Sequence, residues 1–121
     1  MQVKNLFLFG AGASNGCNGT NEIVPLGIGL FTNLKNKFPG TWGTLPPAFE
    51  NDFKDKFEKG MSRLWSDLSY NDKISFFMKD IAIFFSKFKI TDFKQNLYYK
   101  LFRELKKKDA LKETVLSTIN Y

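Results

Sequence analysis

Hydrophobic positions divide the chain into a short apolar run, a long series of helical stripes and a second short apolar run. Val3 to Phe9 is largely apolar and ends at a glycine, which predicts a buried strand. Near the other end, Val115 and Leu116 stand among β-branched residues, which favours a second strand. The pattern therefore predicts two strands with helices between them.

The first two expected helices follow a loop at residues 10–24 that is rich in Gly, Asn, Ser and Thr. One opens at Pro25, because proline suits the first turn of a helix, and it ends at Phe38-Pro39-Gly40. In the other, apolar residues step by fours and threes from Phe49 to Leu68 in one continuous stripe. That spacing predicts a single helix over this second stretch.

Two further helices are expected before the second strand. Ile74 to Phe88 carries a broad apolar stripe, which predicts a helix that is covered on two sides. Phe93 to Leu105 carries another stripe, and the aromatic residues of all these helices are expected in the core rather than around a cofactor. The candidate N-cap residues are Asn71 or Asp72 for the first of these two helices and Thr91 or Asp92 for the second.

Length and composition limit the class of protein. At 121 residues the chain is at most one small domain. It has one cysteine, Cys17, and no histidine, which excludes an internal disulfide, the ordinary zinc sites and a histidine base within this stretch. No apolar run reaches the roughly 18 residues of a membrane span, and the start lacks the pattern of a signal peptide. We therefore expect a cytoplasmic protein that binds no metal and enters no membrane.

The net charge of +6 is concentrated toward the end of the chain. One interpretation is a solvated helix face whose cations suit the C-terminal end of the helix dipole. The other is a surface for nucleic acid. Direct binding of nucleic acid by this segment is not expected, because no aromatic or glycine pattern of an RNA-binding module accompanies the charge. The basic residues concerned are Lys100, Arg103, Lys106, Lys107, Lys108 and Lys112.

The turn that follows the first strand, residues 10–14, reads Gly-Ala-Gly-Ala-Ser. Gly10 can adopt backbone angles that other residues avoid, and Gly12 has no side chain to hold a pyrophosphate away. Exposed N–H groups in such a turn favour anions. The full Rossmann fingerprint is not met, because Gly16 comes one position too late, and a Walker P-loop is excluded since no Gly-Lys-Ser or Gly-Lys-Thr occurs. From the residues alone, a nucleotide-binding turn and a purely structural turn both remain open.

Longer stretches of the chain carry a family resemblance. FLFGAGASNGC, PLGIGLFTNL, FPGTW, FEKGM and LSTINY resemble, in this order, the sirtuin-like domain of bacterial NAD-consuming defence proteins, which are relatives of the silent-information-regulator deacylases. The resemblance implies an α/β fold: a Rossmann-like parallel sheet, with its first two strands present and a bundle of about three aromatic-rich helices inserted at about 48–108. It also implies that residues 1–121 are the N-terminal part of one such NAD-binding domain, truncated at Tyr121, so that the fold is incomplete.

The resemblance also implies a set of site residues. Pro25 and Leu26 match the segment that closes over the nicotinamide-ribose side of the cofactor. Asn120 matches the catalytic asparagine of the family's Thr-x-Asn motif, where a fixed amide dipole can orient water or ribose hydroxyls as an oxocarbenium-like ribose develops. The residues that match the phosphate-holding turn are Gly10, Ala11, Gly12, Ala13 and Ser14.

Departures from the deacylase pattern shape the functional expectation. The chain lacks the Gly-Ile-Pro-Asp-Phe-Arg stretch and the four zinc cysteines, which points to hydrolysis of NAD to nicotinamide and ADP-ribose rather than deacylation. The family's catalytic histidine lies beyond the Thr-x-Asn motif, so an NAD glycohydrolase acting in antiphage defence is expected only for the intact protein, and this fragment alone is expected to be inactive. The main alternative is a non-catalytic module that binds NAD or ADP-ribose or assembles a complex, and a sirtuin-type protein deacylase is a more remote one. The expected partners are NAD and either further copies of the chain or a fused sensor domain.

Overall fold

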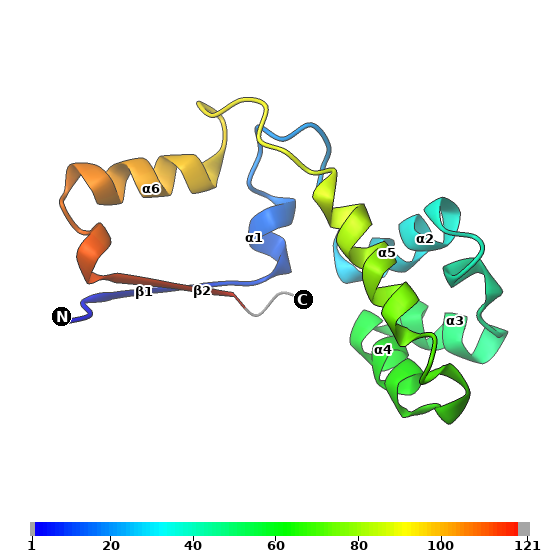
Figure 1. Ribbon diagram of the computed structural model, residues 1–121. Coiled ribbons are helices and arrows are strands. Elements are labelled where there is room, and N and C mark those ends of the chain that lie inside the picture. Colours follow the sequence, from blue (N-terminus) through cyan, green and yellow to red (C-terminus); the bar gives the residue numbers. More distant parts are fainter. Residues whose placement is uncertain (1, 119–121) are drawn as a thin grey trace. The chain divides into compact units, whose positions relative to one another are not determined.

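The computed structural model describes residues 2–118, which form two compact units. The sheet unit comprises residues 2–24 and 88–118, and the helical unit comprises Pro25–Lys87. Figure 1 shows the elements in order along the chain. They are β1 (Asn5–Phe9), α1 (Ala11–Asn15), α2 (Gly27–Lys37), η1 (Trp42–Thr44), α3 (Pro47–Asp55), α4 (Phe57–Ser66), η2 (Leu68–Tyr70), α5 (Ile74–Ser86), α6 (Leu97–Lys107), η3 (Leu111–Glu113) and β2 (Thr114–Thr118).

The sheet unit is built on β1 and β2, which pair in parallel. The register runs from Asn5 opposite Thr114 to Phe9 opposite Thr118, so the carboxyl ends of both strands lie at the same edge. Both strands were predicted from the sequence, although β1 begins at Asn5 rather than Val3. The expectation of an α/β chain with two parallel strands is therefore confirmed.

Helix α6 covers one face of this strand pair (Figure 1). The ring of Tyr98 on α6 packs edge-on against Phe9, with 5.3 Å between the ring centroids. Side chains alternate across a strand, so the other face carries Leu6 and Leu8, which are 68% and 61% exposed. One side of the strand pair is thus packed against a helix, and the other side presents leucine to solvent.

The helical unit has an aromatic core. Phe31 of α2, Trp42 of η1 and Phe53 of α3 are fully buried. The Trp42 ring makes edge-on contacts with Phe53 and with Phe77 of α5, with 5.4 and 5.1 Å between ring centroids. Phe31 stacks on Phe53 with 5.1 Å between centroids. The edge-on contacts suit aromatic rings because the positive ring edge meets a negative ring face, and stacked contacts are a second favourable geometry when the rings are offset. The expectation of an aromatic core is confirmed for these residues, but not for Trp65, Phe76, Phe93 and Phe102, which are exposed. Helix α2 falls in the predicted stretch but begins at Gly27, so Pro25 lies outside its first turn.

The single helix predicted from Phe49 to Leu68 is wrong. Lys56 adopts an extended backbone, with φ −148° and ψ 133°, and separates α3 from α4. The apolar stripe survives the break as far as Leu64, because both helices turn these residues toward one core, with 5.2 Å between the ring centroids of Phe53 and Phe57; Trp65 and Leu68, at its end, are exposed. A Cβ at Gly60 of α4 would run into the Phe53 ring, so this glycine permits the close approach of the two helices.

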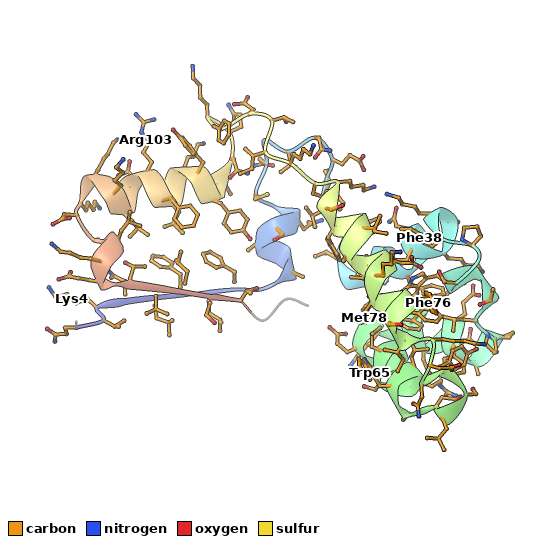
Figure 2. The ribbon with its side chains drawn as sticks, in the orientation of Figure 1. Lys4, Phe38, Trp65, Phe76, Met78 and Arg103 are labelled. Atoms are coloured by element: carbon orange, nitrogen blue, oxygen red, sulfur yellow. The ribbon has the colours of Figure 1, made fainter. Side chains whose placement is uncertain are left out.

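Helix α5 also differs from its prediction. It begins at Ile74, with Lys73 in the N-cap position and no side-chain cap, so neither Asn71 nor Asp72 has the expected role. Its buried residues, Ile74, Phe77 and Phe84, do not account for the whole apolar stripe. Phe76 is 58% exposed, and Met78 and Ile83 are exposed as well; Figure 2 labels Phe76 and Met78 in the helical unit. The prediction that α5 is covered on two sides is therefore wrong.

Helix α6 begins four residues later than its stripe suggested. Phe93 lies outside the helix, and Asn96 is the N-cap residue in place of Thr91 or Asp92. The Asn96 side chain accepts a hydrogen bond from the Tyr99 N–H at 3.0 Å. Helix α6 belongs to the sheet unit, so the segment expected as an insertion at about 48–108 divides between the two units. Among residues 2–118, no helix is long and apolar enough to cross a membrane.

Candidate functional site

The β1–α1 turn comprises residues 10–14, and Gly10 alone separates the end of β1 from the short helix α1. Gly10 is extended, with φ −102° and ψ 177°, so the left-handed freedom that the sequence suggested for it is not used. The Ala13 N–H donates to the Gly10 carbonyl at 2.9 Å, which closes the first turn of α1. Helix geometry leaves the N–H groups of Ala11 and Gly12 without intrahelical acceptors, because no preceding turn exists. The turn therefore presents unused donors at the edge of the sheet.

Gly12 has open space where a side chain would project. A Cβ built on this residue meets no atom of residues 2–118 within 4 Å, apart from its chain neighbours and the backbone of its own helix, and the residue is exposed. Glycine inside a helix lowers stability by roughly 1 kcal/mol relative to alanine. Since no packing contact among the described residues requires glycine at this position, Gly12 is explained by neither local strain nor crowding within the protein.

The hydroxyl of Ser14 is held toward α6. Ser14 Oγ lies 3.0 Å from Tyr98 Oη, within hydrogen-bond distance. Because the Tyr98 ring also packs on Phe9, the phenol links the end of β1 to the last part of the turn. Sequence reasoning counted Tyr98 only as a core position of its helix, and nothing in the helical spacing shows that its hydroxyl meets Ser14.

The loop that follows α1 is anchored to the segment before α6. Asn96 is fully buried and donates from its amide to the Asn18 carbonyl at 2.8 Å. The Leu97 N–H donates to the Cys17 carbonyl at 2.7 Å, and the Cys17 thiol is buried. Gly19 has φ +62°, and a Cβ there would strike the Asp92 carbonyl, so the glycine is required. Positive φ is thus used in this loop rather than at the turn.

The end of β2 lies beside the β1–α1 turn. Thr118 pairs with Phe9, and the Thr118 hydroxyl donates to the Phe9 carbonyl at 3.3 Å. Asn120, the predicted catalytic residue, lies outside the described residues. The structure therefore brings together residues 10–14, Tyr98 and the last described residue of β2.

Pro25 and Leu26 belong to the helical unit. Leu26 is the N-cap residue of α2, and its carbonyl accepts hydrogen bonds from Gly29 and Leu30, both at 3.0 Å. Val24, just before them, is tied to the sheet unit, because the Asn15 amide donates to its carbonyl at 2.8 Å. The predicted site residues thus divide, with the turn in the sheet unit and Pro25 and Leu26 at the start of the helical unit.

The chemistry that this arrangement offers is binding of an anion by backbone donors and hydroxyls. Within residues 2–118, no group of three or more Cys, Asp or Glu side chains gathers in a way that could hold a metal ion. The sequence contains no histidine that could act as a base. Comparison of the chain with protein-family models, with characterised proteins and with solved structures found no match in any of the three.

Proposed function

We propose that the β1–α1 turn binds the phosphates of NAD. The observation that carries this proposal is Gly12, which is exposed, lies in the first turn of α1 and, among the described residues outside this helix, has no atom within 4 Å of the position of a Cβ. A glycine that destabilises its helix and that no protein neighbour requires is explained if a ligand approaches the backbone there. The first-turn N–H groups would then donate to phosphate oxygens.

The parallel strand pair supports the same assignment. Ligands of parallel α/β sheets bind outside the carboxyl ends of the strands. The register of Phe9 opposite Thr118 puts the β1–α1 turn at that edge, and Asn120 follows Thr118 by only two residues. We therefore propose that residues from both strand ends serve one dinucleotide, in a Rossmann-like sheet of the sirtuin-like family.

For the intact protein we propose hydrolysis of NAD to nicotinamide and ADP-ribose, in antiphage defence. Asn120 would orient water or ribose hydroxyls while positive charge develops on the ribose. The resemblance assigns the base to a histidine, and these 121 residues contain none. We therefore propose binding for this chain, and catalysis only where this part is joined to a segment that supplies the base. The same lack of histidine favours the alternative, a module that binds NAD or ADP-ribose without chemistry.

The test is an NMR titration of the ¹⁵N-labelled chain with NAD and with ADP-ribose, which detects weak binding. We expect the amide signals of residues 10–14 to shift with both ligands, and Gly12→Ala to weaken the effect while raising the melting temperature. Gly40→Ala is the matched control, because a Cβ at Gly40 also meets no atom within 4 Å but lies in the helical unit. We expect this control to leave the titration unchanged.

Two results would contradict the proposal. One is a titration that leaves the signals of residues 10–14 unmoved. The other is a Gly12→Ala variant that binds NAD as the parent chain does. Release of nicotinamide by the 121-residue chain, lost in Asn120→Ala, would contradict the expectation that the chain alone is inactive.

A further inference from the structure

We propose that the outer face of α6, together with the segment before it, binds a single-stranded nucleic acid. This outer face is defined by two aromatic and four basic residues. It is independent of the β1–α1 turn and needs no NAD. Its members are Phe93, Lys94, Tyr99, Lys100, Arg103 and Lys106.

The outer face is exposed because α6 uses its other side for packing. Leu105 is buried and Tyr98 packs on Phe9, so this side of the helix faces the strands. Tyr99, Arg103 and Lys106 are spaced by four and three residues, which places them on one side of a helix. Figure 2 shows Arg103 on the side of α6 that points away from the strands.

Two aromatic rings lie among the cations of this face. Phe93 and Tyr99 are 55% and 40% exposed, and their rings meet edge-on with 5.3 Å between centroids. The helical spacing predicts Phe93 as a core residue, and a buried ring could not bind nucleic acid together with the basic residues. The structure instead places an exposed ring pair next to them. Exposed aromatic rings beside cations are what single-stranded bases need for stacking.

In the described part of the chain, the cations of this face form no ion pairs with carboxylates. They are Lys94, Lys100, Arg103 and Lys106. Three other lysines of the sheet unit differ, because they pair with carboxylates: Lys107 with Glu104 at 3.2 Å, Lys112 with Asp109 at 2.7 Å and Lys4 with Glu113 at 2.8 Å. Uncompensated positive charge on one face favours a polyanion, since binding releases its counterions.

The same features argue for a single strand rather than a duplex or a membrane. A duplex stacks its own bases, so the rings of Phe93 and Tyr99 would have nothing to stack on. A membrane-surface helix inserts its apolar face into lipid. On α6, Leu105 is buried and Tyr98 packs on Phe9, so this part of its apolar side is engaged with the strands, whereas Leu97 and Phe102 are exposed.

The test is fluorescence anisotropy with a fluorescein-labelled 20-nucleotide oligo(dT) and the 121-residue chain at low salt. We expect binding that weakens with salt, and a duplex of the same length should bind at least tenfold more weakly. Arg103→Glu should lower the affinity about tenfold and reduce the salt dependence. Lys79→Glu, the same charge change at an exposed position of α5, is the matched control and should have little effect.

The aromatic part of the proposal has its own variants. Tyr99→Ala should weaken binding about tenfold, whereas Tyr99→Phe keeps the ring and should bind like the parent chain. Far-UV circular dichroism melts show that each variant is folded. The proposal is overturned if oligo(dT) does not bind at low salt, if Lys79→Glu weakens binding as much as Arg103→Glu, or if Tyr99→Ala has no effect. Equal binding of the duplex, or preferential binding to vesicles of phosphatidylserine and phosphatidylcholine, also overturns it.

Discussion

Asn96 is the residue on which the sheet unit depends most clearly. It is fully buried, and both ends of its amide are bonded: the oxygen accepts from the Tyr99 N–H and the nitrogen donates to the Asn18 carbonyl. One side chain therefore caps α6 and holds the loop after α1. Removal of either partner of such a bond leaves a buried polar group without a partner.

We expect Asn96→Ala to lower the free energy of unfolding of the sheet unit by about 2 kcal/mol, from the lost cap and the unpaired Asn18 carbonyl. The measurement is urea denaturation followed by far-UV circular dichroism. Asn96→Asp is the matched comparison: it keeps the acceptor for Tyr99, but it turns a carboxylate oxygen toward the Asn18 carbonyl in a fully buried position, so it should cost at least as much as Asn96→Ala at neutral pH. An unchanged midpoint in Asn96→Ala would contradict this account.

The sequence identified residues 10–14 as a candidate binding turn, but it could not predict the backbone conformation of its glycines or the hydrogen-bond partner of Ser14. Gly10 and Gly19 are the same type of residue, yet Gly10 has an extended backbone and Gly19 has positive φ. The difference arises because Gly19 lies against the carbonyl of Asp92, more than 70 positions along the chain. Ser14 likewise gains its partner Tyr98 through packing of α6 on β1. Contacts between distant residues decided both cases.

Helices α3 and α4 show what periodicity can and cannot predict for an element. The spacing of Phe53, Phe57 and Leu64 correctly identified buried positions. It could not reveal the break at Lys56, since no glycine or proline lies there and both helices keep their apolar sides on one core. The strands and the body of α2 were predicted well, because apolar runs and helical spacing are local signals, whereas the predicted helix start at Pro25 was two residues too early.

The close approach of α3 and α4 predicts the effect of a small substitution. Gly60→Ala should destabilise the helical unit by about 1–3 kcal/mol, although alanine favours a helix, because the new methyl group meets the buried Phe53 ring. The midpoint of urea unfolding, followed by tryptophan fluorescence, measures this. Gly40→Ala places its methyl group in open space and should not destabilise. A stabilised Gly60→Ala variant would show that the helices can separate freely.

An ion pair between α3 and α4 makes the helical unit sensitive to acid. The side chain of Arg63 donates to buried Asp52, and this bond holds the pKa of Asp52 below its usual value against the opposite effect of burial, with a further lowering from Lys59. A carboxylate with a lowered pKa stabilises the fold above its unfolded value of about 4, and this stabilisation is lost as the pH falls through the folded value.

We therefore expect Asp52→Asn to lower the melting temperature at neutral pH and to make little difference at about pH 2, where the parent carboxylate is also protonated. Thermal melts of both proteins between these two pH values measure the difference. Asp72→Asn, in the exposed turn before α5, is the control and should follow the parent chain. A difference between Asp52→Asn and the parent that stays constant down to about pH 2 would contradict the role of the ion pair.

The whole molecule consists of two units with separate cores, and the tryptophans report on only one of them. Trp42 and Trp65 both lie in the helical unit. Circular dichroism reports on helices of both units, since α6 belongs to the sheet unit. We expect Asn96→Ala to shift the circular dichroism transition while the fluorescence midpoint stays at the parent value. Equal shifts by both probes would show that the units unfold as one.

The anchored loop after α1 has a kinetic consequence. Its backbone forms hydrogen bonds with residues 89–97 at Cys17, Gly19 and Asn21. The buried side chain of Asn96 donates a further hydrogen bond to the loop at the Asn18 carbonyl. A mobile lid must break such bonds every time it opens. A dinucleotide arriving at the β1–α1 turn should therefore meet a surface that is already in its final shape, so mixing experiments should give a single exponential whose rate rises in proportion to ligand concentration, without a plateau.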